Sequence, residues 1–214
     1  MIRADKTTTK IRAVFYASCK VNGPSLNERL YSGPNLISKI FDILIRFRLN
    51  TIAIMADIKQ AFLNVAITPE HRDYLHFLWH ALDSDETIVY KFCRVVFGLT
   101  SSPFLLNATI KHHLNRYIES EQFVIERLKR DLYVDDLVSG SNSLAQGQEL
   151  YDKSKATMLD AGFDFRKWET NHQELRAYIT SQEHCKFDTS PGADETTYTK
   201  ITCNPTVEKT NNSM

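Results

Sequence analysis

The chain has 214 residues, of which 43% are hydrophobic and 24% are charged, a composition that supports one sizeable folded domain and excludes wholesale disorder. Its 26 Lys and Arg residues balance 26 Asp and Glu residues, which excludes a uniformly basic nucleic-acid-binding surface but not charge gathered on one face. We expect no secretion signal, no membrane span and no membrane partner, and we interpret the four cysteines, which form no CxxC pair, as inert thiols.

Apolar and turn-forming residues alternate irregularly along the chain, which favours an α+β fold over a doubly wound sheet. Runs of β-branched and aromatic residues predict strands, and apolar residues at spacings of three and four predict helices. The expected strands are residues 11–17, 51–56, a hairpin of 74–80 and 87–96, two short strands at a tight turn within 132–139, and 163–168. The expected helices are residues 36–49, 103–118, 122–131 and 143–161, with a helical turn at 58–63.

Three other stretches have no such pattern. We expect residues 1–10 to be disordered, and residues 18–34, which contain Asn-Gly-Pro and Ser-Gly-Pro, to form a loop. Residues 172–214 lose apolar periodicity, and residues 188–214 are rich in Thr, Asn, Pro and Glu, so we expect an irregular and disordered tail.

Three aspartates stand beside the expected buried strands. Asp57 ends the strand at 51–56, and Asp135 and Asp136 occupy the turn within 132–139. Neighbouring buried carboxylates are costly unless a cation holds them together, and Mg²⁺ prefers hard oxygen ligands of this kind. If the turn lies beside the end of the 51–56 strand, three carboxylates converge as a two-metal phosphoryl-transfer site requires.

Each of these aspartates also has a structural interpretation. Adjacent aspartates are common in solvent-exposed turns, and Asp57 could cap the helical turn at 58–63. The apolar surroundings favour a metal site, but spacing alone leaves both interpretations open.

Five segments, in order, resemble the motifs of reverse transcriptases. Tyr133-Val-Asp-Asp136 resembles the YxDD signature, and Ala56-Asp57-Ile-Lys-Gln-Ala61-Phe62 resembles the first acidic motif of that family. Phe97-Gly98-Leu-Thr-Ser-Ser-Pro103-Phe is similar to the family's Gly-Leu…Pro loop. Ile11-Arg12-Ala-Val-Phe is similar to a fingers strand. Gly162-Phe-Asp-Phe-Arg-Lys-Trp168 is similar to the palm segment after the catalytic hairpin.

Further stretches resemble the BEL/Pao group of retrotransposon polymerases, namely Ser25-Leu-Asn, Gly33-Pro-Asn-Leu and Phe41-Asp-Ile-Leu-Ile-Arg-Phe-Arg48. The resemblance covers residues 11–171 and implies a polymerase palm, a ferredoxin-like βαββαβ antiparallel sheet with helices on one face, plus partial fingers and no thumb. It also implies a truncated copy of a retrotransposon polyprotein, located in the cytoplasm (in a retroelement particle) or in the nucleus. Tyr16 departs from the group, which usually has Asp there.

The resemblance assigns metal-binding roles to four residues. Asp57, Asp135 and Asp136 would be the catalytic carboxylates that bind two Mg²⁺ or Mn²⁺ ions. Asp57 and Asp135 would be direct ligands of both ions, and Asp136 would be a weaker or single-metal partner. The backbone carbonyl of Ile58 would also face a metal ion.

The resemblance assigns nucleotide-binding roles to other residues. Arg12 would hold the triphosphate, Phe62 would exclude a 2′-hydroxyl, Gly98 would allow close backbone approach, and Tyr133 would pack near the primer end. Their structural alternatives are an exposed edge charge, core packing, a turn glycine and a cross-strand aromatic. Lys167 lies where the family pattern has a proton donor, with an ordinary surface lysine as the alternative.

Two functions follow from these residues. The first is an RNA-directed DNA polymerase core that uses deoxynucleoside triphosphates and an RNA or DNA template with a primer. The second is a catalytically inactive remnant with at most weak nucleic-acid binding, which the neutral charge, Tyr16 and the expected lack of a thumb favour. An unrelated metal-dependent nuclease is disfavoured, because it has no use for the Gly-Leu…Pro loop.

Overall fold

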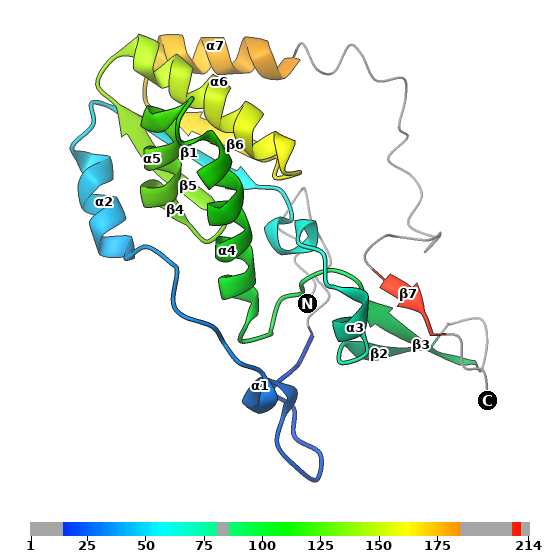
Figure 1. Cartoon of the computed structure of the whole chain (residues 1–214). Helices are drawn as coiled ribbons and strands as arrows, with labels where there is room; N and C mark the ends of the chain where they lie inside the picture. Colours follow the sequence, from blue (N-terminus) through cyan, green and yellow to red (C-terminus); the bar gives the residue numbers. More distant parts are fainter. Residues whose placement is uncertain (1–14, 81–85, 185–206, 211–214) are drawn as a thin grey trace. The chain divides into compact units, whose positions relative to one another are not determined.

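The computed structural model describes residues 15–80, 86–184 and 207–210 of the chain (Figure 1). Three sequence expectations fall wholly or largely outside these residues: disorder at 1–10, the strand at 11–17, and most of the tail at 172–214. Residues 15–17 are described and contain no strand. Within the described residues, no helix combines the length and apolar character needed to cross a bilayer.

The chain forms two compact units. The first, which we call the three-stranded unit, consists of the described residues within Met1–Asn35, Phe62–Leu106 and Cys203–Met214. The second, the four-stranded unit, consists of those within Leu36–Ala61 and Asn107–Thr202. The 3₁₀ helix η1 (Ala61–Asn64) and helix α4 (Ser102–Leu114) each cross a boundary between the two.

An antiparallel sheet organises the four-stranded unit, with its strands in the order β4-β5-β1-β6. The strands are β1 (Ile52–Ile58), β4 (Leu132–Tyr133), β5 (Asp136–Ser141) and β6 (Phe165–Thr170). The helices are α2 (Ile40–Arg48), α5 (Gln122–Asp131), α6 (Leu144–Asp160) and α7 (Gln173–His184), with a 3₁₀ turn η2 (Asn115–Tyr117). Helices with antiparallel sheets confirm the predicted α+β class, and the chain order of this unit follows the expected βαββαβ pattern. The palm and fingers assignment stays a prediction.

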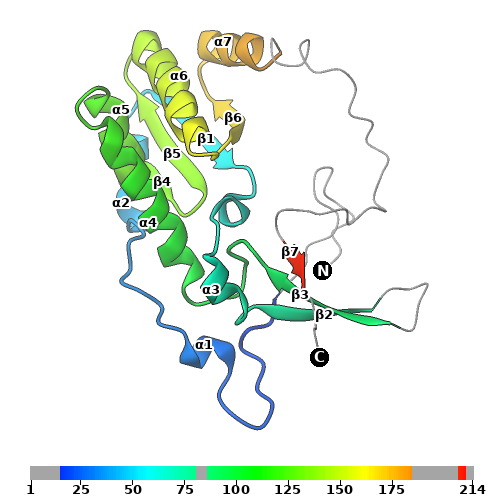
Figure 2. The same ribbon diagram turned by 45° about the vertical axis from the view of Figure 1, so that its right-hand side comes forward.

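Strand β1 shows why one face of this sheet is covered and the other is more open. Ile52, Ile54 and Ile58 are buried, whereas Met55 between them is 43% exposed. A strand sends alternate side chains to opposite faces, so the isoleucines define the core face. Helices α5 and α6 pack on this sheet (Figures 1 and 2). Asp57 follows the pattern of Met55 and lies on the open face.

Helix α6 begins and ends at residues that the sequence signals. The hydroxyl of Ser143 accepts a hydrogen bond from the backbone N–H of Gln146, which caps the first turn. The chain leaves the helix through Gly162, whose φ of 79° suits a residue without a Cβ atom. The expected helix at 143–161 is therefore confirmed.

A second antiparallel sheet organises the three-stranded unit, in the order β2-β3-β7. Its strands are β2 (His76–His80), β3 (Thr87–Phe92) and β7 (Val207–Lys209), and its short helices are α1 (Leu26–Arg29) and α3 (Pro69–Arg72). A small core lies in this unit, made of Ala17, Leu75, Val96 and Leu99. The hairpin expected from residues 74–80 and 87–96 is confirmed by the pairing of β2 with β3.

Three elements correct the sequence expectations. Helix α1 lies within the expected loop at 18–34, where Ser25 and Glu28 form a reciprocal capping box. Helix α7 and strand β7 lie within residues expected to be irregular. Helix α7 buries only Leu175 and Ile179, too few apolar positions to produce a visible period. Strand β7 pairs with β3 through backbone hydrogen bonds, and no side-chain pattern in the sequence predicts this pairing.

Candidate active site

The hairpin of β4 and β5 presents the acidic pair at a two-residue turn. Tyr133 and Asp136 are register partners, so Val134 and Asp135 alone form the turn. Val134 has a φ of 57°, in the left-handed region, which costs a residue with a Cβ atom about 1–2 kcal/mol. The tight turn predicted within residues 132–139 is confirmed.

Strand β1 brings Asp57 beside this turn. Asp57 and Asp136 are direct partners in the antiparallel pairing of β1 with β5. The backbone N–H of Ile58 donates a hydrogen bond of 2.8 Å to the carbonyl of Asp135, which fixes the turn to the end of β1. Partial burial and then the charge of Asp57 raise the pKa of Asp136, while Lys167 acts in the opposite direction. Two carboxylates therefore lie close enough on neighbouring strands to repel one another.

Strand β6 supplies two cations to the same carboxylate. The Nε atom of Arg166 lies 3.1 Å from Oδ2 of Asp57, and Nζ of Lys167 lies 3.2 Å from that oxygen. Arg166 is also the register partner of Asp57 in the pairing of β1 with β6. The structure thus brings Asp57, Asp136 and the two cations together at one end of the sheet.

The donor set at this end suits a hard divalent cation. Within the described residues, no group of three or more His, Cys, Asp and Glu side chains is arranged to hold a metal ion. Asp57 and Asp136 nevertheless supply two adjacent carboxylates. Mg²⁺ usually takes one or two carboxylates from the protein and completes its shell with water and substrate phosphates. The pair therefore fits such an ion, and roles for the Asp135 side chain and the Ile58 carbonyl stay predictions.

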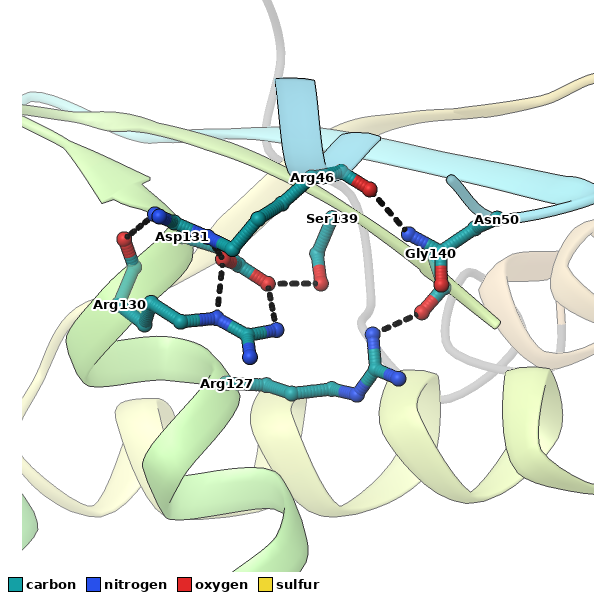
Figure 3. Close-up of polar contacts among 7 residues, drawn as sticks. All are labelled: Arg46, Asn50, Arg127, Arg130, Asp131, Ser139 and Gly140. Carbon is teal, nitrogen blue, oxygen red and sulfur yellow. Dashed lines mark hydrogen bonds and ion pairs between the residues drawn. The ribbon is translucent and has the colours of Figure 1, made fainter. Parts of the chain in front are cut away.

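A buried carboxylate at the base of the hairpin holds its two strands together (Figure 3). Asp131 precedes β4, and its side chain is only 3% exposed. Its Oδ2 atom accepts a hydrogen bond of 2.8 Å from the hydroxyl of Ser139 on β5. Arg46 of α2 and Arg130 of α5 both contact Oδ1, at 3.1 and 2.8 Å. Burial by itself would raise the pKa of Asp131, but the hydrogen bonds it accepts, led by those from Arg130 and Ser139, hold it below its ordinary value.

Further along β5, an arginine of α5 contacts the strand backbone (Figure 3). The guanidinium of Arg127 donates to the carbonyl of Gly140. A Cβ atom at Gly140 would lie 2.4 Å from the backbone oxygen of Ile52, so only glycine allows β5 to approach β1 so closely. The strand that follows Asp136 is therefore fixed by both charged and steric contacts.

A comparison with protein families agrees with this geometry. The family model described as reverse transcriptase (RNA-dependent DNA polymerase) matches residues 15–181, which is most of the chain. This chain belongs to the reverse transcriptase family. No match was found among curated proteins. The match supports RNA-directed DNA polymerase function in general, and with it a nucleic-acid template and nucleotide substrates.

Two of the residues that the resemblance assigns to nucleotide binding in this reverse transcriptase domain lie in the three-stranded unit. The ring of Phe62 is buried and packs edge-to-face on Phe97, with 4.6 Å between the ring centroids. Gly98 has a φ of 102°, and a Cβ atom there would lie 2.2 Å from the carbonyl oxygen of Phe15. Core packing and close chain contact therefore explain both residues locally, and their roles toward a nucleotide stay predictions.

The other two nucleotide-binding assignments concern Tyr133 and Arg12. Tyr133 is half-buried and lies opposite Asp136 in the hairpin, so its position beside the acidic pair is observed and its contact with a primer is predicted. Arg12 lies outside the described residues.

Asp131, Ser139 and Arg46 were not predicted from the sequence as site residues. A signal for Asp131 exists, because it is an acidic residue set directly before the apolar Leu-Tyr-Val run, next to an arginine. For Arg46, which lies 85 residues from Asp131, no local pattern marks the contact.

Proposed function

We propose that this chain carries out template-directed nucleotidyl transfer as an RNA-directed DNA polymerase, with the primer 3′-hydroxyl attacking the α-phosphate of a deoxynucleoside triphosphate. The observation that carries the proposal is the in-register pair of Asp57 and Asp136 within the part of the chain that the reverse transcriptase family matches. In this proposal the four-stranded unit is the palm and the three-stranded unit is part of the fingers. The BEL/Pao lineage rests on the sequence stretches that resemble that group.

The protein's contribution in this proposal is position and charge. Asp57, Asp135 and Asp136, together with the Ile58 carbonyl, would hold two Mg²⁺ or Mn²⁺ ions. Bound there, such ions stabilise the negative charge that develops on the attacking and leaving oxygens. The hydrogen bond from Ile58 to Asp135 keeps the turn against β1, and Asp131 keeps the base of the hairpin closed.

Substrate selection would involve the predicted contacts outside the carboxylate pair. Phe62 would exclude a ribonucleotide by leaving no room for its 2′-hydroxyl. Arg12 would hold the triphosphate, and the template would be RNA or DNA annealed to a primer.

The test is primer extension on an RNA template by purified full chain with Mg²⁺ and deoxynucleoside triphosphates. We expect extension by the wild type and none by Asp57→Asn, Asp135→Asn or Asp136→Asn. Asp160→Asn is the matched control, because Asp160 lies on α6 and accepts a hydrogen bond from Tyr117 rather than facing the sheet. Loss of extension in this control, or extension by Asp57→Asn, would count against the proposal.

A second candidate is a catalytically inactive remnant that binds nucleic acid weakly. Its support is the Asp57 carboxylate, which two cations contact in a chain without a three-carboxylate group among its described residues. A wild-type chain that is folded, as circular dichroism would verify, and that extends no primer would favour this candidate.

A further inference from the structure

Strand β6 contains one residue more than β1 at the level of the acidic pair. Met55 pairs with Glu169, and the next pair is Asp57 with Arg166, so two steps along β1 match three steps along β6. The residue that absorbs the difference is Lys167, whose φ of 54° lies in the left-handed region. This is the geometry of a β-bulge.

The bulge changes which way the side chains of β6 point. Phe165 is buried in the core, and Trp168 packs edge-to-face on its ring. Arg166 and Lys167 between them both reach the open face, where they contact Asp57. In a regular strand two consecutive residues point to opposite faces. The bulge is therefore the reason that Asp57 has two cations rather than one.

The two cations differ in how firmly they are held. Arg166 donates a hydrogen bond from Nε to Oδ2 of Asp57, and its side chain is 32% exposed. Lys167 makes an ion pair with the same oxygen, and its side chain is 55% exposed. An ammonium on a flexible stem is a point charge that moves easily, whereas a guanidinium bonds in a fixed plane. Lys167 is thus the more exchangeable partner.

We propose that Arg166 and Lys167 form a built-in counter-ion for Asp57 that competes with divalent cations for this carboxylate. Arg166 keeps the carboxylate oriented, and Lys167 leaves it when a divalent cation binds. The bulge thereby sets the metal affinity of the site below that of an unopposed pair of carboxylates. The inference rests on the proposed function, because it takes Asp57 as a metal ligand.

The consequence is a gain of metal affinity when the lysine charge is removed. An exposed ion pair contributes roughly 0.2–1 kcal/mol, so Lys167→Gln should tighten Mn²⁺ binding by about 1.4- to fivefold. A lysine that merely supported the fold would give no gain. Lys167→Arg keeps the charge and should bind Mn²⁺ as the wild type does.

The experiment is a calorimetric titration of the folded full chain with MnCl₂ alone, without nucleotide or primer. The matched control is Lys153→Gln, which removes a lysine paired with other carboxylates. Nζ of Lys153, on α6, lies 2.5 Å from Glu121, the N-cap of α5, and 2.9 Å from Glu149 of α6. This control should leave the affinity unchanged. Asp57→Asn reports on the site itself and should lose Mn²⁺ binding.

The outcomes separate the inference from the proposed function. Tighter binding by Lys167→Gln, with wild-type affinity in Lys167→Arg and Lys153→Gln, supports the counter-ion. Unchanged or weaker binding by Lys167→Gln, with binding lost in Asp57→Asn, overturns the counter-ion and leaves the metal site standing. Equal binding by the wild type and Asp57→Asn overturns both.

Discussion

The two hairpins of this chain are held together in different ways. The β4–β5 hairpin turns in two residues and is closed by contacts to a buried carboxylate, Asp131. In the β2–β3 hairpin, Phe77 stacks on Tyr90 and Phe92, with 5.7 and 4.6 Å between ring centroids, and most of β2 is exposed. Aromatic stacking keeps two strands paired, whereas directional bonds to a buried charge also fix where the turn points.

The charged contacts of the two hairpins illustrate the difference. Asp131 is 3% exposed and contacts arginines from two helices, whereas Asp73, beside β2, is 67% exposed and contacts Lys91 at 3.2 Å. Removing the buried carboxylate of Asp131 takes the charged acceptor from two arginines that are themselves 27% and 47% exposed. The exposed pair of Asp73 and Lys91 is instead readily replaced by solvent. The hairpin that carries Asp136 is therefore the one whose geometry depends on a single carboxylate.

The largest expected effect is at Asp131. Asp131→Asn should lower the free energy of unfolding by about 2 kcal/mol, because the partly exposed Arg46 and Arg130 lose the charged acceptor of their hydrogen bonds. Asp73→Asn, the matched change at the other hairpin, should cost less than about 1 kcal/mol. Urea unfolding of both variants measures the loss in free energy of unfolding. Equal losses in the two variants would show that the two hairpins do not differ in their dependence on a single carboxylate.

The cost of Asp131→Asn should also depend on pH. The pKa of Asp131 in the folded chain lies below its ordinary value of 3.8, so its ionised form contributes stability that is present above that value and is lost as the pH falls through the folded pKa. The difference in unfolding free energy between wild type and Asp131→Asn should therefore be full at neutral pH and shrink below about pH 4. A difference that stays constant down to pH 3 would show that charge is not its source.

A smaller effect is expected at Ser139. Ser139→Ala should cost about 1 kcal/mol, because the buried carboxylate of Asp131 loses one donor but keeps its arginines. Thr87→Ala in the other hairpin removes an exposed contact of 3.4 Å to His80 and should cost only a few tenths of that. Chemical denaturation again provides the measurement. A Ser139→Ala variant as stable as the wild type would show that the Ser139 hydroxyl does not stabilise the hairpin.

The smallest effect is expected at the turn itself. Val134→Gly removes the strain of a β-branched residue in the left-handed conformation, but it also increases the conformational entropy of the unfolded chain. These two effects should nearly cancel, so the free energy of unfolding should change by less than about 0.5 kcal/mol. Val138→Gly, on β5 of the same sheet, gains no such relief and should cost more. Thermal denaturation of Val134→Gly and Val138→Gly measures their stabilities. A larger loss of stability in Val134→Gly than in Val138→Gly would contradict the strain assigned to the turn.

Local sequence patterns predicted the elements that carry the acidic residues. The run TIAIMA ends near Asp57 as expected, and apolar residues on both sides of Asp135 and Asp136 predicted the hairpin. Patterns of this kind work because burial of alternate side chains is local in sequence.

The contacts that orient the site were not predictable in the same way. Arg46 fits a favourable helix end, yet its guanidinium contacts Asp131, 85 residues away. The bulge of β6 occurs at Lys167, where a glycine or asparagine would have signalled the left-handed conformation and a lysine does not. Partner choice across the sheet is a tertiary property, and the one-residue offset of a bulge changes it without changing the apolar pattern.

Backbone hydrogen exchange with and without Mg²⁺ tests the claim that the pair of Asp57 and Asp136 binds metal at the fixed hairpin. We expect Mg²⁺ to slow exchange at the Ile58 amide, which donates to the carbonyl of Asp135, and to leave exchange in β2 and β3 unchanged. Asp57→Asn should abolish the slowing. An Ile58 amide that exchanges at the same rate with and without Mg²⁺, or that is slowed equally in Asp57→Asn, would contradict the claim.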